Sequence, residues 1–172
     1  MGIAVTAAVG LGGNIGDAAA TLREALQALD ALPRTRLLKA SPLYRTRAWG
    51  NTEQPDFVNA VALLRTELDA RALLDALLEV ELRFGRDRSA GEPWGPRTLD
   101  LDLLLHGDAI IDEPGLTVPH PRLRERAFVL VPLARVAPGL RIPGLGPVSA
   151  LLDAVDAGDC VPLAAIAPED AP

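Results

Sequence analysis

Hydrophobic and polar residues follow one another along the chain in patterns that predict four strands and two helices. Apolar runs and period-two alternation predict strands at residues 3–11, 37–47, 57–66 and 98–106. Apolar residues at helical spacing predict one helix that is capped by Asp17 and ends before Pro33, and a second over residues 69–82. The β-α-β-β-α-β order predicts an α/β (α+β) fold of the ferredoxin-like kind, a mainly antiparallel sheet with both helices on one face.

The other face of that sheet needs a cover or a ligand. Residues 121–136 predict a short third helix that supplies part of the cover, and the proline-rich stretch after it predicts loops with a short helix near residues 149–155. The length of 172 residues, with 49% hydrophobic and 23% charged residues, suits one globular domain and excludes a disordered or coiled-coil chain. We therefore predict a single domain over residues 1–160 and a frayed tail over residues 161–172.

Charge and cysteine content exclude several classes of protein. The net charge of −6 argues against a nucleic-acid partner, because phosphate backbones are held by an excess of lysine and arginine. No apolar run reaches the roughly 18 residues that a membrane span needs. The single cysteine, Cys160, cannot form an internal disulfide, and the N-terminus lacks the basic segment of a signal peptide, so we expect a cytoplasmic protein.

Two acidic residues lie two positions apart on the last predicted strand. Asp100 and Asp102 therefore project from the same face, about 7 Å apart given the rise per residue. Two carboxylates that close repel each other unless a cation lies between them. The strand is otherwise all leucine, which predicts a central, buried strand where an unpaired carboxylate would be costly. Oxygen ligands at this spacing suit Mg²⁺, which commonly takes other ligands from phosphates. A solvated strand face that carries two acids is the alternative reading.

A loop with several arginines runs directly into this acidic strand. The loop spans residues 85–97, contains glycine and proline, and carries Arg86, Arg88 and Arg97 without a lysine. A triphosphate held by magnesium and by arginine side chains is consistent with this pattern. The alternative is that the arginines only pair with neighbouring acidic residues.

Three other features of the sequence are candidate sites. The glycine-rich segment 10–16 lacks the dinucleotide-binding spacing, because Ile15 stands where a glycine is needed, and no P-loop motif occurs in the chain. Asn59 alternates with apolar residues and shares its side of the strand with Phe57, so it faces a ligand or the core. His120 lies shortly before an arginine cluster, where it either contacts phosphate or is a surface loop residue.

Taken together, these motifs resemble one family, the 6-hydroxymethyl-7,8-dihydropterin pyrophosphokinases of the folate pathway. The resemblance runs in unbroken order from about residue 3 to residue 135, and Trp-Gly-Pro-Arg-Thr-Leu-Asp-Leu-Asp at residues 94–102 is its most specific part. The other matching segments are Tyr-Arg-Thr at 44–46, Gln-Pro-Asp-Phe-Val-Asn-Ala at 54–60, Val-Pro-His-Pro at 118–121 and Arg-Ala-Phe at 126–128. The resemblance implies a ferredoxin-like fold and transfer of the β,γ-pyrophosphate of ATP to the pterin hydroxymethyl group, which leaves AMP.

The resemblance also implies roles for individual residues. Asp100 and Asp102 would hold two Mg²⁺ ions that bridge the triphosphate and the attacking hydroxyl, with Arg86 and Arg97 as further catalytic residues. The residues that would bind ATP are Arg86, Arg88, Arg97, His120 and Arg126. The residues that would bind the pterin are Thr46, Phe57, Asn59, Trp94 and Phe128, with the two phenylalanines on either side of the flat ring. We expect a monomer whose partners are ATP and 6-hydroxymethyl-7,8-dihydropterin.

Two other functions stay open at this point. One is a ferredoxin-like ligand-sensing module without catalysis, in which the aspartates and arginines only pair with each other. The other is a different two-metal enzyme on the same scaffold, a nucleotidyl transferase, which would release pyrophosphate from ATP where the pyrophosphokinase releases AMP.

Overall fold

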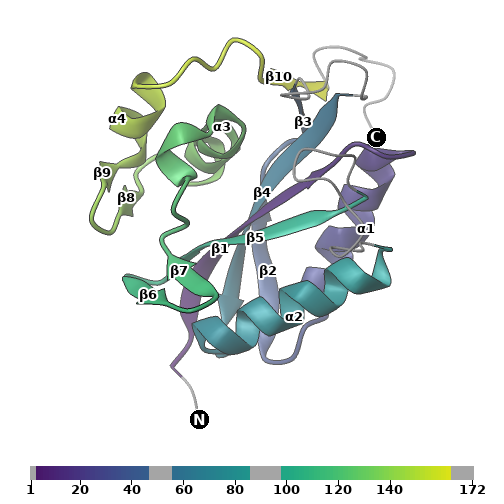
Figure 1. The fold of residues 1–172 in the computed structure, drawn as a ribbon, viewed down its shortest axis with the longest axis vertical. Coiled ribbons are helices and arrows are strands. Elements are labelled where there is room, and N and C mark those ends of the chain that lie inside the picture. The colour runs from purple at the N-terminus through teal and green to yellow at the C-terminus, as the bar shows by residue number, and fades with distance from the viewer. Residues whose placement is uncertain (1–2, 47–55, 86–97, 164–172) are drawn as a thin grey trace.

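A computed structural model describes residues 3–46, 56–85 and 98–163 of the chain. Its main feature is an antiparallel sheet in the order β10-β3-β4-β1-β5, in which β2 also pairs with β4 (Figure 1). The strands of this sheet are β1 (Val5–Gly13), β2 (Thr35–Ala40), β3 (Tyr44–Thr46), β4 (Phe57–Thr66), β5 (Asp100–His106) and β10 (Val161–Pro162). The predicted β-α-β-β-α-β order of the elements is confirmed. The leucine-rich last strand was expected to be central, but β5 lies at an edge of the sheet, next to β1, and it is the helices packed on it that bury its leucines.

Two helices cover one face of the sheet, as predicted. They are α1 (Ala18–Asp30) and α2 (Ala70–Arg83), and an aspartate carboxylate caps each one. Asp17 accepts from the Ala20 N–H at 3.1 Å, and Asp69 accepts from the Ala72 N–H at 2.8 Å. Both helices bury leucines against alternate residues of the central strands, which forms the larger of two apolar clusters.

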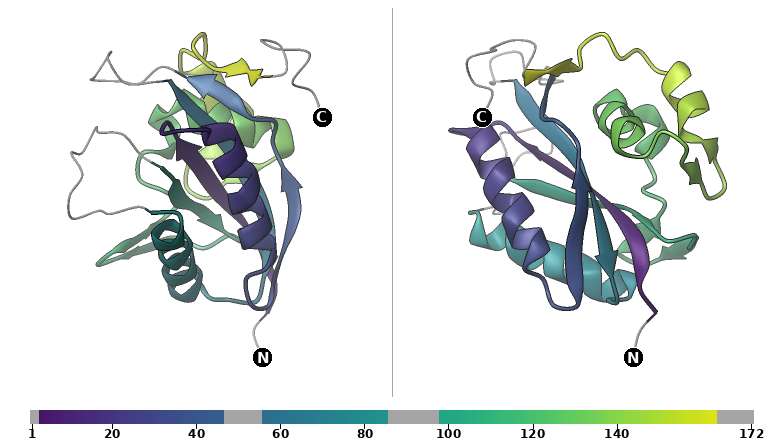
Figure 2. Two further views of the ribbon diagram at one scale, coloured as in Figure 1. Left: turned by 90° about the vertical axis from the view of Figure 1, so that its right-hand side faces the viewer. Right: turned by 180° about the vertical axis from the view of Figure 1, so that it is seen from behind.

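A third helix covers part of the opposite face (Figure 2). Helix α3 (Ala127–Val136) follows a 3₁₀ turn, η1 (Leu123–Glu125), and contacts the short helix α4 (Val148–Asp153). Leu130 and Leu133 are fully buried in a second cluster that includes Val61 and Leu104 of the sheet. The predicted helix over 121–136 is therefore two elements, because Arg126 between them has extended backbone, with φ −112° and ψ 101°.

The predicted strand over residues 37–47 is also two elements, β2 and β3. Ser41 ends the first by bonding to β4: its N–H donates to the Val61 carbonyl and its hydroxyl accepts from the Val61 N–H. Pro42 then offers no N–H to continue the ladder. Both strands pair with β4 in the same antiparallel direction, so the interruption leaves the topology unchanged.

Several short strands have no counterpart in the sequence-based prediction. Two hairpins pair β6 (Ile111–Glu113) with β7 (Leu116–Val118), and β8 (Arg141–Ile142) with β9 (Gly146–Pro147). Strand β10 pairs Val161 with Arg45 of β3, so the sheet extends past the predicted domain boundary at residue 160.

None of the helices in the described parts of the chain has the length and apolar character that a membrane span requires.

The structure predicts unequal effects for alanine at two glycines of β1. A Cβ at Gly12 would lie 2.7 Å from Asn59 Oδ1, whereas a Cβ at Gly10 would meet Leu104 at an ordinary 3.6 Å. We expect Gly12→Ala to lower the free energy of unfolding by about 1–3 kcal/mol, and Gly10→Ala to leave it within about 1 kcal/mol of wild type. Urea denaturation of both variants checks this, and equal effects would contradict the crowding at Gly12.

Candidate active site

The sheet face that α3 covers only in part carries five of the eight predicted site residues that the structure describes. Gly12 of β1 pairs with Asn59 of β4 on one side and with Asp100 of β5 on the other. Directly paired residues of antiparallel strands project to the same face, so these three form one row across the sheet. Because Gly12 has no side chain, the Asn59 amide can lie over its backbone, where a Cβ would meet Asn59 Oδ1 at 2.7 Å.

Asp102 lies two residues along β5 and pairs with Gly10. Leu101 and Leu103, which alternate with the aspartates, are buried in the cluster on the α1 and α2 side of the sheet. The aspartates therefore share the opposite face, as the two-residue spacing predicted. The Asp102 side chain is 37% exposed, so a ligand can reach it.

Two basic side chains approach the Asp102 carboxylate from the segment between β7 and α3. His120 Nε2 lies 3.9 Å from Asp102 Oδ1, and Arg126 Nη1 lies 3.6 Å from Asp102 Oδ2. The backbone N–H of His120 donates to the backbone carbonyl of Leu104 in β5, and this bond anchors the segment next to the strand that carries the aspartates. His120 and Arg126, which the family resemblance assigns to ATP binding, therefore lie beside Asp102.

The surroundings of His120 favour its neutral form. Burial lowers the pKa of His120, the positive charges of Arg126 and Arg122 lower it further, and Asp102 opposes them. The imidazole Nδ1 accepts a hydrogen bond from the backbone N–H of Arg122 at 3.2 Å. The neutral ring therefore carries its proton on Nε2, which faces Asp102. His120 can therefore donate a hydrogen bond to an anionic ligand without contributing a full charge.

Arg126 also contacts an aromatic ring. Its guanidinium carbon lies 5.5 Å from the centre of the Phe128 ring, within the range of a cation–π contact. The extended backbone at Arg126 separates it from α3, while Phe128 lies in the first turn of that helix. The break in the predicted helix thus lets one arginine reach both Asp102 and the ring.

A buried polar pair lies on the other side of Gly12. Asn59 Nδ2 donates to Thr46 Oγ1 at 2.7 Å, and both residues are buried. Thr46 pairs directly with Phe57, which lies two residues before Asn59 on β4 and so projects to the same face. Thr46, Phe57 and Asn59 are therefore brought together on one face.

The described residues fit part of a magnesium site. They contain no group of three or more histidine, cysteine, aspartate or glutamate side chains that could hold a metal ion. The two aspartates supply hard oxygen donors, as Mg²⁺ prefers, but further ligands have to come from water or a phosphorylated substrate. Four predicted residues, Arg86, Arg88, Trp94 and Arg97, lie outside the described residues.

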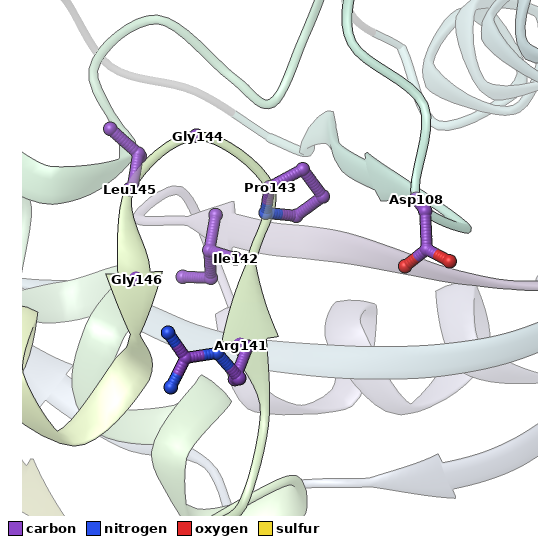
Figure 3. A pocket seen from close by; sticks show the side chains of 7 residues that line it. All are labelled: Asp108, Arg141, Ile142, Pro143, Gly144, Leu145 and Gly146. Carbon is purple, nitrogen blue, oxygen red and sulfur yellow. The ribbon is translucent and has the colours of Figure 1, made fainter.

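A separate hollow of about 420 Å³ lies beside the β8–β9 hairpin (Figure 3). It is lined by Asp108 and residues 141–146, none of which is a predicted site residue.

One buried acidic residue near the aspartates was missed by the sequence-based reasoning. Glu81 of α2 accepts a hydrogen bond from the backbone of Leu101, between Asp100 and Asp102. It follows Leu77 by four residues and so falls on the apolar face of the helix, which is the signal that could have found it.

Comparison with known proteins shows the family to which the chain belongs. The family model of 7,8-dihydro-6-hydroxymethylpterin-pyrophosphokinase (HPPK) matches residues 8–138. A 2-amino-4-hydroxy-6-hydroxymethyldihydropteridine pyrophosphokinase of Pseudomonas aeruginosa is 50% identical over 135 residues, which cover 78% of this chain and 82% of the relative. A protein of the same name from Synechocystis sp. is 42% identical over 162 residues, or 94% of this chain and 80% of the relative.

Solved structures agree with the fold. The chain aligns with wild-type Plasmodium falciparum HPPK-DHPS, crystallised with pteroate, at a TM-score of 0.71 and 13% identity. The alignment covers 99% of this chain but only 44% of that longer one. The fold, the residues matched by the family model and the similarity to the bacterial relatives together establish that this chain belongs to the HPPK family, whose reaction is pyrophosphoryl transfer to hydroxymethyldihydropterin in folate biosynthesis.

Proposed function

We propose that this chain transfers the β,γ-pyrophosphate of ATP to the hydroxymethyl group of 6-hydroxymethyl-7,8-dihydropterin and leaves AMP. The observation that carries the proposal is the row across β4, β1 and β5, with the hydrogen-bonded Asn59 at one end and Asp100 at the other. Adjacent strands are about 4.8 Å apart, so the two ends of the row lie about 10 Å apart. A two-ring heterocycle bound at Asn59 can therefore direct its hydroxymethyl group towards the aspartates.

The pterin end of the site is assigned to four described residues. Asn59 and the backbone near Thr46 are suited to read the hydrogen-bonding edge of the pterin, because the bond from Asn59 Nδ2 to the Thr46 hydroxyl fixes the amide in one orientation. Phe57 and Phe128 would offer aromatic faces to the flat ring.

The triphosphate end is assigned to the aspartates and their basic neighbours. Asp100 and Asp102 would hold two Mg²⁺ ions, which when bound would neutralise phosphate charge and stabilise the attacking and leaving oxygens. His120 and Arg126 would donate to phosphate oxygens, since at 3.9 and 3.6 Å neither is hydrogen-bonded tightly to Asp102. Arg86, Arg88, Arg97 and Trp94 would complete this end from the segment outside the described residues. A cytoplasmic location, a monomeric state and a single domain over residues 1–160 stay predictions.

The first test is analysis of the nucleotide products. We expect AMP to form from ATP and Mg²⁺ only when 6-hydroxymethyl-7,8-dihydropterin is present, without release of free pyrophosphate. The control omits the pterin. Free pyrophosphate would favour a nucleotidyl transferase, and folded protein that forms no AMP would favour the sensing module.

Asp102→Asn tests the assignment of the metal ligands. The metal ions would contribute several kcal/mol to stabilisation of the transition state, so loss of one of their ligands should lower kcat/KM by about a hundredfold or more. Partial exposure of Asp102 predicts that thermal unfolding changes little. The matched control is Asp108→Asn, an exposed aspartate just after the same strand, which should keep the wild-type rate. A rate within fivefold of wild type for Asp102→Asn would overturn the assignment.

The neutral state of His120 predicts a pH dependence of stability. An unfolded histidine has a pKa near 6.5, and burial lowers the pKa of His120 in the folded protein. As the pH falls below about 6.5, the unfolded chain takes up this proton first, so stability is lost by at most about 1.4 kcal/mol per pH unit. We expect urea denaturation at pH 7.5 and 5.5 to show a smaller loss for His120→Asn than for wild type. Identical losses would contradict the neutral assignment.

A further inference from the structure

Glu81 is a buried acid for which the proposed reaction gives no role. It lies in the last turn of α2, is 1% exposed, and is the one charged side chain among the buried residues of the described parts of the chain. Its Oε2 accepts a hydrogen bond from the backbone N–H of Leu101 at 2.6 Å. The carboxylate is therefore bonded to the strand that carries the two aspartates, at the residue between them.

The position of β5 explains why Leu101 needs a partner from a helix. β5 is the edge strand of the described sheet, so N–H groups that point away from β1 have no strand to bond. The Leu101 N–H belongs to the peptide unit that joins it to Asp100, and this unit is planar. Fixing that N–H therefore also fixes the orientation of the Asp100 backbone at the first residue of β5.

Burial penalises a charged group, and the negative end of the α2 dipole adds to the penalty in the last helical turn. A buried carboxylate therefore needs hydrogen-bond partners, and the Leu101 N–H is one of them. What the carboxylate adds is a strong, charge-assisted hydrogen bond that fixes β5 against α2.

We propose that Glu81 is a positioning residue of the pyrophosphoryl-transfer site, which holds the β5 backbone so that Asp100 and Asp102 keep the spacing needed to bind two divalent ions. The inference rests on the proposed function, because it takes the aspartates as metal ligands. Glu81 acts on the aspartates only through its hydrogen bond to the Leu101 backbone. The Leu101 side chain is buried in the core, so core packing and the Glu81 bond together fix the position of this residue.

The first experiment measures divalent-ion binding without turnover. Mn²⁺ affinity is measured by electron paramagnetic resonance in the presence of α,β-methylene-ATP for wild type, Glu81→Leu and Glu81→Gln. We expect Glu81→Leu to weaken Mn²⁺ binding by about ten- to a hundredfold, as loss of a group that orients a metal ligand does. Glu81→Gln retains an acceptor oxygen and should recover most of that loss. Glu79→Leu and Glu79→Gln, at an exposed position of the same helix, are the matched controls and should bind as wild type does.

A second measurement needs neither metal nor nucleotide. Hydrogen exchange of the Leu101 amide should be faster in Glu81→Leu than in wild type, and close to wild type in Glu81→Gln and in both Glu79 variants. This readout follows the hydrogen bond itself, whereas urea denaturation of the same variants reports global stability.

The outcomes separate this inference from the proposed function. Wild-type Mn²⁺ affinity in Glu81→Leu, with only a change in the free energy of unfolding, would make Glu81 a structural residue and overturn the inference while the proposed function stands. Unchanged exchange at Leu101 would overturn it as well. Failure of wild-type protein to bind Mn²⁺ with the ATP analogue would overturn the proposed function and the inference with it.

Discussion

The antiparallel pairing of β1 with β4 on one side and β5 on the other is the constraint on which the site depends. It brings Asn59, Gly12 and Asp100 into one row, although they belong to three separate parts of the chain. The glycine is essential to the arrangement, because a side chain in the middle of the row would meet the Asn59 amide. The same register leaves the aspartates on the face where α3 gives only partial cover, and so within reach of a substrate.

The electrostatic arrangement around Asp102 suits a ligand better than a structural ion pair. Arg126 and His120 lie at 3.6 and 3.9 Å, longer than hydrogen bonds, and burial keeps His120 neutral. A sensing module held together by its charges would need tight, saturated pairs, because loosely paired charges contribute little to stability. These groups are instead placed close enough to receive a phosphate and loosely enough to turn towards it.

Local patterns predicted most of the fold, and pairings between distant segments account for what was missed. The spacing of apolar residues predicted the strand over residues 57–66 and the two capped helices, and these apolar residues are the ones buried in the core. The break between β2 and β3 has a local signal in Pro42, but its place also depends on the bonds of Ser41 to Val61, and β10 depends on a pairing with the distant β3. The two-residue spacing predicted the face shared by the aspartates. The family resemblance assigned His120 and Arg126 to ATP binding, but their approach to Asp102 depends on how the segment before α3 packs against β5. Glu81 was missed because a charge on a helix is usually exposed.

The edge position of β5 connects the fold to the chemistry. At 13% identity to a solved HPPK-DHPS, the chain keeps the backbone path at a TM-score of 0.71, yet a fold by itself does not determine a reaction. In the described residues, this path places β5 at an edge of the sheet and turns its acidic face towards the side that α3 covers only in part, so that a bulky, highly charged substrate can reach it. That advantage has a structural cost, because an edge strand lacks the hydrogen bonds of a neighbour on its outer side. In this chain a carboxylate from α2 supplies one of those bonds, at the residue between the two aspartates.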